Sequence, residues 1–209
     1  MDAIESRDHR HAGAVEVTLD FLNTDELDGG QWVETLPTLR EAAAWLVGRG
    51  LLYPEEAGPL GGLDEGRQQD LLGHLHEARA AIRAVVESLV TGRPAAEAAI
   101  MTVNGLLRAR TVVELDHADG AVVARHRHVG DAFEGALARL AEPLVDAVAS
   151  GETGRFRICA NDGCLWVFED TSRTGRRRWC SMASCGNRAK AARNRARQRG
   201  QLPAAPSTS

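Results

Sequence analysis

The stretch CANDGCLWVFEDTSRTGRRRWCSMASCGNRAKAARNRARQR, residues 159–199, carries all four cysteines of the 209-residue chain. They form two pairs with the same internal spacing, Cys159-x4-Cys164 and Cys180-x4-Cys185, and fifteen residues separate the pairs. Two short-spaced pairs joined by a longer loop bring four sulfurs together while ordering little chain. This pattern decides how the C-terminal part of the chain folds.

A tetrahedral zinc ion suits such a set, because Zn²⁺ takes four soft thiolate ligands at about 2.3 Å. Two other interpretations stay open: two disulfides, or four unrelated buried cysteines. Disulfides are rare in a reducing compartment, and the rest of the chain has no cysteine, which argues against chance clustering. We predict one zinc ion with a structural role, because four protein thiolates leave no coordination position for a reacting water.

Aromatic side chains near the cysteines are candidates for a small core beside the metal. The segment Leu165–Phe168 predicts a strand with Trp166 and Phe168 on one face, and Trp179 would complete this core. Base stacking by Trp166 or Trp179 is the alternative. Nearby arginines would offset the negative charge of a zinc–thiolate cluster.

The run after the last cysteine, residues 186–199, contains strong helix formers and no acidic residue. On a helical wheel the cations divide into two nearly opposite faces, Arg188, Arg195 and Arg199 on one and Lys190, Arg193 and Arg197 on the other. Charged neighbours four residues apart all repel each other here, which destabilises an isolated helix. We therefore expect an external polyanion to neutralise the run.

Nucleic acid is the predicted partner, because phosphates would neutralise both flanks of such a helix in a DNA groove. The candidate DNA-binding residues are Arg176, Arg177, Arg178, Asn187, Arg188, Lys190, Arg193, Arg195, Arg197 and Arg199. Two alternatives stay open: the arm folds back on the acidic first 150 residues, or it is an idle tail. One small module buries little surface, so a homodimer on a two-fold site is a further expectation.

Acidic and basic residues are unevenly distributed about Gly151. Residues 1–150 hold 13 Lys and Arg against 25 Asp and Glu, whereas residues 151–209 hold 12 against 4. Such asymmetry is typical of a basic arm that meets a polyanion. No apolar stretch approaches the roughly 20 residues that span a bilayer, so we expect no membrane partner and a cytoplasmic location.

The first 150 residues predict a mostly helical domain with a small β component, so the whole chain is expected to be mainly α in an α+β arrangement. Helices are expected at residues 38–47, 67–90, 94–109 and 131–151. Two β-rich segments flank Asp119-Gly120 and predict a β-hairpin near 111–128. Residues 15–23 fit a short strand or a helix start.

The expected domains are residues 1–150, a zinc module with a basic helix at 151–199, and a disordered tail at 200–209. Asp20, Asn23 and Thr24 would line a pocket or cap the next segment, and capping is the preferred interpretation. His126 and His128 are interpreted as an exposed polar edge rather than a metal site. The sequence has no glycine-rich phosphate loop, no nucleophile elbow and no pair of carboxylates with a spacing that supports catalysis, so we expect no enzymatic activity.

The C-terminal region closely resembles the CGNR zinc finger, named for the motif that stands here at residues 185–188. The resemblance covers roughly residues 155–197 and includes the four cysteines, Phe168, Asp170, Ser172, Arg173, Arg177, Arg178, Trp179 and Ser181. The upstream part is similar to the ABATE domain in the segment LDFLNT at 19–24, the Ala44-Trp45-Leu46 helix, the long helix rich in Leu and Arg, and Asn104.

This resemblance implies a bacterial stress-induced transcription regulator that binds DNA through its finger, with the four cysteines as zinc ligands and Arg188 as a DNA or structural contact. The expected function is therefore zinc-dependent DNA binding, with an N-terminal domain that senses a small-molecule effector or dimerises. Two alternatives remain: a protein-interaction zinc module whose basic arm docks on acidic surfaces, and an N-terminal small-molecule-binding or enzymatic domain regulated by the finger.

Overall fold

The computed structural model describes residues 8–28, 31–118 and 120–199, so the predicted tail at 200–209 lies outside the described residues. The α-helices are α1 (Asp8–Leu22), α2 (Leu39–Gly48), α3 (Pro54–Ala57), α4 (Glu65–Thr91), α5 (Glu97–Leu106), α6 (Ala132–Ser150) and α7 (Asn187–Gln198). Shorter helical turns are η1 (Gly58–Gly62), η2 (Glu152–Arg155) and η3 (Met182–Gly186). Helices dominate the described chain, which confirms the predicted mainly helical class.

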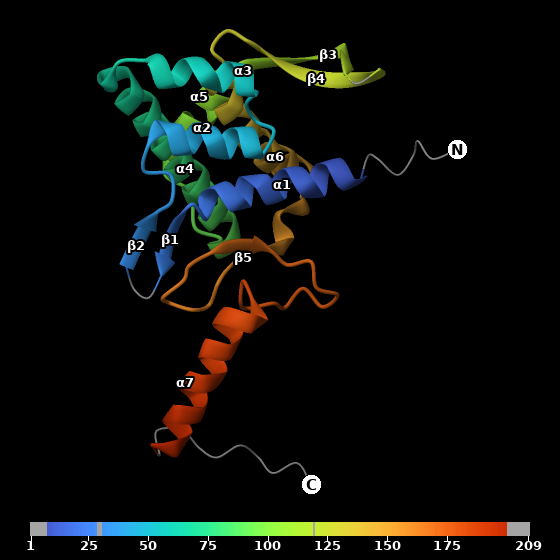
Figure 1. Cartoon of the computed structure of the whole chain (residues 1–209). Helices are drawn as coiled ribbons and strands as arrows, with labels where there is room; N and C mark the ends of the chain where they lie inside the picture. Colours follow the sequence, from blue (N-terminus) through green and yellow to red (C-terminus); the bar gives the residue numbers. More distant parts are fainter. Residues whose placement is uncertain (1–7, 29–30, 119, 200–209) are drawn as a thin grey trace.

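The strands form three separate antiparallel ribbons, each of two strands. They are β1 (Asp25–Asp28) with β2 (Gln31–Glu34), β3 (Arg110–Ala118) with β4 (Ala121–Val129), and β5 (Phe156–Ile158) with β6 (Val167–Glu169). The β3–β4 ribbon and α7 lie at opposite ends of the molecule (Figure 1). The β5–β6 ribbon lies between the helical body and α7 (Figure 1).

Helix α4 is the central helix of the N-terminal region and packs against α1, α2, α5 and α6. Its start is fixed by Asp64, whose side chain accepts a hydrogen bond from the backbone N–H of Arg67 at 3.0 Å. It ends at Gly92, whose φ of 70° is a left-handed conformation that glycine adopts without a Cβ clash. Leu75 and Ile82 are fully buried on its inner face, so the helix predicted at 67–90 is confirmed.

Helices α1 and α6 pack against each other and complete the main hydrophobic core. In the undecided segment 15–23, residues 15–22 are helical, as the end of α1, and they include Phe21 and Leu22, which are completely buried. The hydroxyl of Thr18 donates a buried hydrogen bond to the carbonyl oxygen of Leu140 in α6 at 2.9 Å. Burial of these side chains decides the conformation of a segment whose own pattern was ambiguous.

The hairpin predicted near 111–128 is confirmed as the β3–β4 ribbon, which pairs Arg110 with Val129 and runs to the turn at Gly120. The interpretation of His128 as part of an exposed edge is wrong: its side chain is 1% exposed. It lies against α6, where a Cβ atom at Gly135 would be 2.0 Å from its Nδ1 atom. The alternation of the strand therefore turns His128 toward the helix, and the missing side chain at Gly135 leaves room for it.

The β1–β2 ribbon was not predicted, because its strands have only four residues each and β1 is DELD. An ion pair between the half-buried Glu34 of β2 and the buried Arg79 of α4 anchors it to the body. Arg79 also donates to the hydroxyl of Thr24 at 2.8 Å. A tertiary contact of this kind leaves no periodic signal in the sequence.

Residues on both sides of the expected boundary near Gly151 share one hydrophobic core. Phe156 of β5 and Val167 of β6 are buried with the leucines of α1 and α4 rather than with the cysteines. The cysteines form a second, smaller cluster with Phe168. The β5–β6 ribbon therefore has its main apolar contacts with the helical body.

Candidate metal centre and basic surface

The β5–β6 ribbon positions the first cysteine pair. Cys159 directly follows β5, and Cys164 lies shortly before β6. The backbone N–H of Cys159 donates to the carbonyl oxygen of Trp166 at 2.8 Å, which extends the pairing beyond Ile158 and Val167. The intervening turn is closed by the N–H of Cys164, which donates to the carbonyl oxygen of Asn161 at 2.8 Å.

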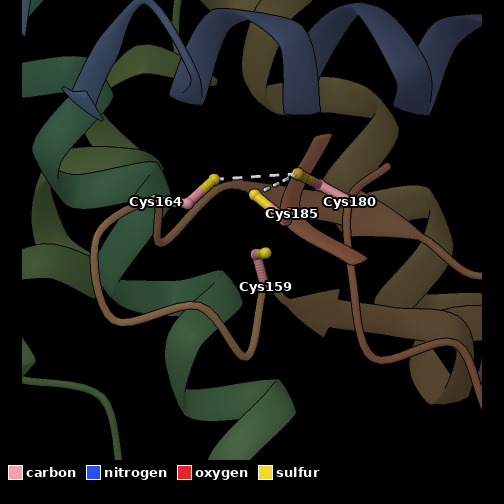
Figure 2. Close-up of side chains that lie close together, drawn as sticks. All are labelled: Cys159, Cys164, Cys180 and Cys185. Carbon is pink, nitrogen blue, oxygen red and sulfur yellow. Dashed lines mark hydrogen bonds between the residues drawn. The ribbon is translucent and has the colours of Figure 1, made fainter. Parts of the chain in front are cut away.

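All four cysteine sulfurs converge on one point (Figure 2). The Sγ atoms lie within 4.8 Å of one another, with Cys164 to Cys180 at 3.6 Å and Cys180 to Cys185 at 3.7 Å. A tetrahedron of sulfurs at about 2.3 Å from zinc has edges of about 3.8 Å. The four residues are free thiols rather than disulfides, so their geometry fits one tetrahedral zinc ion.

The electrostatics of the cluster couple metal binding to the release of thiol protons. Burial raises the pKa of the Cys164 thiol to about 11 and also raises the pKa of Cys180, because buried surroundings disfavour the charged thiolate. Burial also acts to raise the pKa of Cys185, but hydrogen bonds outweigh it, the first from Asn161, and the net shift is downward. The Nδ2 of Asn161 donates to this sulfur at 3.3 Å. Such outer bonds orient metal ligands.

The small core beside the cysteines contains Phe168 and the half-buried Trp179, as predicted. Trp166 is not part of it, and the prediction that Trp166 and Phe168 share one face of a strand is wrong. Leu165 has a φ of 57°, so β6 begins only at Val167. The indole of Trp166 instead donates to Glu26 of β1 at 2.7 Å.

Asp170 organises the loop between the cysteine pairs. Its buried carboxylate accepts hydrogen bonds from the hydroxyl of Ser172 at 2.5 Å and from the backbone N–H groups of Ser172 and Arg177 at 3.0 and 2.8 Å. The Ser172 hydroxyl bond, followed by the two backbone bonds, lowers the pKa of Asp170. No role for Asp170 was predicted from the sequence, although an acidic residue two positions before a serine is a signal for such a turn.

The second cysteine pair leads directly into the basic helix. Cys185 lies in the π-helical turn η3, which continues into α7 without a break. A Cβ atom at Gly186 would lie 2.4 Å from Sδ of Met182 and 3.3 Å from Cδ1 of Trp179, so the exposed Met182 side chain would have to move to admit one. The Nδ2 of Asn187 donates to the carbonyl oxygen of Ala183 at 3.1 Å. The CGNR motif thus supplies a cysteine that can bind the metal, a glycine in close contact with Met182 and Trp179, and the first residues of α7.

Arg177 differs from the other candidate DNA-binding residues, because its guanidinium is engaged within the finger. It donates to the carbonyl oxygens of Trp179 and Cys180 and stacks on Phe168, with Cζ 4.7 Å from the ring centroid. Arg178 is exposed and lies over the ring of Trp179, and Arg176 is exposed as well. Arg177 therefore holds the loop, while its two neighbours face solvent.

The remaining candidates lie on α7 or, for Arg199, directly after it, and α7 extends away from the helical body (Figure 1). All are exposed: Asn187, Arg188, Lys190, Arg193, Arg195, Arg197 and Arg199. Among residues 8–28, 31–118 and 120–199, no carboxylate forms an ion pair with Lys190, Arg193, Arg195, Arg197 or Arg199. In the described part of the chain the basic helix therefore does not fold back on the acidic region.

The structure also locates Asp20, Asn23 and Thr24, for which capping was expected. Asp20 forms an ion pair with Arg49 at 2.7 Å, and the Thr24 hydroxyl donates to the carbonyl oxygen of Phe21 at 2.7 Å at the end of α1. The side chain of Asn23 is buried and bonds to both backbone groups of Val167. Asn23 therefore joins the helical body to the finger.

Comparisons with known proteins agree with this architecture. Residues 16–151 match the model of the ABATE family, described as "Putative stress-induced transcription regulator", and residues 155–198 match the model of the CGNR zinc finger. A search of curated proteins found no match. Within the described residues, no helix is both long and apolar enough to cross a membrane. The cluster of Cys159, Cys164, Cys180 and Cys185 is thus a site for one zinc ion, and the chain belongs to the ABATE family, with a CGNR zinc finger following the ABATE domain.

Proposed function

We propose that the chain is a transcription regulator that binds duplex DNA through α7 and the adjoining arginine loop, and that it is not an enzyme. The observation that carries this proposal is a row of exposed cations on α7, of which Lys190, Arg193, Arg195 and Arg197 form no ion pair with a carboxylate in the described chain. The family description supports the regulatory role. The effector, the homodimer and the cytoplasmic location remain predictions.

The dimensions of α7 suit a DNA groove. Its twelve residues span about 18 Å at about 1.5 Å per residue, and the major groove of about 12 Å width admits one α-helix. The two cationic faces would each lie toward one phosphate backbone, with the small Ala189, Ala192 and Ala196 between them. Asn187 and the arginines then supply donors for base edges.

Zinc fixes the direction in which α7 leaves the finger. Cys185 and α7 belong to one continuous helical segment, so a bond between the metal and this sulfur anchors the base of the helix. An anchored helix loses less freedom on binding than a flexible basic tail. The metal acts here as a structural support, because its ligand shell is complete without water.

A salt titration with the zinc-loaded full chain tests the proposal. With about six phosphate contacts, log K against log salt should have a slope of about −5 on a duplex. Reversing two charges in Arg193→Glu/Arg197→Glu should abolish binding, and Arg93→Glu, an exposed arginine outside the finger, is the matched control. Weak binding with a flat salt response, equal in both variants, contradicts DNA binding and favours the protein-interaction alternative.

A further inference from the structure

The segment that links the metal site to the helical body, Leu165–Val167, starts directly after the ligand Cys164. All three of its residues are held by the N-terminal region. Val167 is held through its backbone, Trp166 through its indole, and Leu165 through its carbonyl oxygen. Each residue of this segment of the finger thus forms a hydrogen bond with the ABATE domain.

The strongest of these links is made by Asn23, the residue after α1. Its Nδ2 donates to the carbonyl oxygen of Val167 at 2.8 Å, and its Oδ1 accepts from the N–H of Val167 at 2.9 Å. Both bonds are buried, and Val167 itself is completely buried. The amide of Asn23 thus pairs with β6 as the backbone of a neighbouring strand would. Loss of the amide would leave two buried backbone groups without partners.

Leu165 is held in a conformation that a leucine rarely adopts. Its φ of 57° is left-handed, which costs free energy for any residue that has a Cβ atom. Arg83 of α4 donates to its carbonyl oxygen at 3.4 Å and to the carbonyl oxygen of Leu22 at 2.7 Å. The same guanidinium therefore joins the end of α1 to the residue that follows a zinc ligand.

Trp166 connects the first cysteine pair to the helical body, because its backbone binds one and its side chain binds the other. Its carbonyl oxygen accepts from the N–H of Cys159 at 2.8 Å, while its indole donates to Glu26 at 2.7 Å. The conformation of both ligands of the first pair is thus tied to contacts with α1, α4 and β1.

The second cysteine pair is held in another way. The N–H of Ala160 donates to the carbonyl oxygen of Arg178, and Asn161 donates to the sulfur of Cys185. These hydrogen bonds run within the finger. Arg177 adds contacts of the same kind, because it stacks on Phe168 of β6 and donates to the carbonyl oxygen of Cys180. None of these contacts involves the N-terminal region, and the metal would join the two pairs directly.

We infer that Asn23 is a positioning residue of the zinc site, which it controls through Val167 and Cys164 from outside the finger. The N-terminal region pre-forms the half-site of Cys159 and Cys164, and zinc then recruits Cys180, Cys185 and α7 to it. Metal loss accordingly releases α7 while β5 and β6 stay folded. This inference concerns the metal site alone and does not depend on DNA binding.

Metal competition on the full chain tests the role of Asn23. Zinc affinity is measured against a chromophoric chelator for the wild type, Asn23→Leu and Thr18→Val. The control Thr18→Val also removes a buried hydrogen bond from α1, but its partner is Leu140 rather than the finger. We expect Asn23→Leu to weaken zinc binding about tenfold, as outer-shell substitutions do, and Thr18→Val to change it less than twofold. Equal affinities in the two variants would overturn the inference.

Hydrogen exchange of the wild type is a second test, which holds even if Asn23→Leu folds poorly. After chelation, amides of residues 156–158 and 167–169 should stay protected, whereas amides of residues 182–198 should exchange rapidly. Equal loss of protection in both regions, or protection retained in both, contradicts the inference.

Discussion

Gly135 of α6 lies so close to His128 of β4 that a Cβ atom at position 135 would be 2.0 Å from the imidazole Nδ1. The histidine is buried against the helix, and among the described residues neither ring nitrogen has a hydrogen-bond partner. The ribbon and the helix therefore meet at a position where only glycine fits.

Gly135→Ala is predicted to destabilise the fold by about 1–3 kcal/mol, because an overpacked core displaces its neighbours. Urea unfolding measures this change. The double variant Gly135→Ala/His128→Ala should be less destabilised than the sum of the two single variants, because the clashing ring is absent. Strict additivity would show that the ring and the glycine do not interact.

Stability should fall in mild acid because of His128. Burial is the main cause that lowers its pKa below 6.5, with Arg139 acting in the same direction, while Glu56 at 3.7 Å and Asp131 oppose the shift. As pH falls below about 6.5 the unfolded chain binds a proton that the folded chain resists, so the free energy of unfolding decreases by at most about 1.4 kcal/mol per pH unit. Above this range the effect is absent.

Urea titrations at several pH values between 5 and 7.5 measure this dependence. The variant His128→Leu should flatten the pH profile in this window. The control His117→Leu removes an exposed histidine and should leave the profile unchanged. A wild-type profile that is already flat contradicts the prediction.

One zinc ion per chain is predicted from the four-cysteine cluster. Metal analysis after purification should give about one equivalent, and Cys185→Ser should reduce it strongly, because three thiolates and a hydroxyl bind zinc more weakly than four thiolates. Removal of the metal should expose Phe168 and Trp179, which pack on the cysteines. A full equivalent of zinc in Cys185→Ser would exclude this residue as a ligand.

Gly186→Ala is predicted to lower zinc affinity. The added Cβ would displace the side chain of Met182 and tighten the contact with Trp179 beside Cys185. Zinc affinity should therefore decrease, whereas Gly73→Ala, at an exposed position of α4 with open space around it, should leave it unchanged. A chelator titration measures this affinity.

Individual cations of α7 should contribute separately to DNA affinity. Arg193→Ala and Arg197→Ala should each reduce the salt slope by about 0.9 if each neutralises one phosphate. Arg177→Ala should act through the finger, because its guanidinium binds Trp179 and Cys180. It should therefore weaken zinc binding first. An unchanged slope in Arg193→Ala would remove that residue from the interface.

The helices and the metal cluster could be predicted from the sequence because their signals are local. The period of apolar residues in α4 and the spacing of Cys159-x4-Cys164 are each visible within a short stretch of the sequence. The four sulfurs that the spacing predicted do converge. Predictions held wherever neighbouring residues alone determine the structure.

Contacts between distant residues could not be predicted. Asn23 and Val167 are 144 positions apart, and nothing near Asn23 indicates that its amide pairs with a strand. The burial of His128 depends on a glycine in the next helix, and the β1–β2 ribbon depends on Arg79 of α4. The prediction that Trp166 shares a strand face with Phe168 was wrong because the left-handed Leu165 delays the start of β6 to Val167.

The separation of α7 from a body rich in carboxylates gives the molecule a permanent electric dipole. The first 150 residues contain 25 acidic and 13 basic side chains, and α7 contributes cations at one extremity. In the field of a polyanion such a dipole experiences a torque before any contact forms. Collisions would then occur with the helix leading, and the acidic body would be kept at a distance.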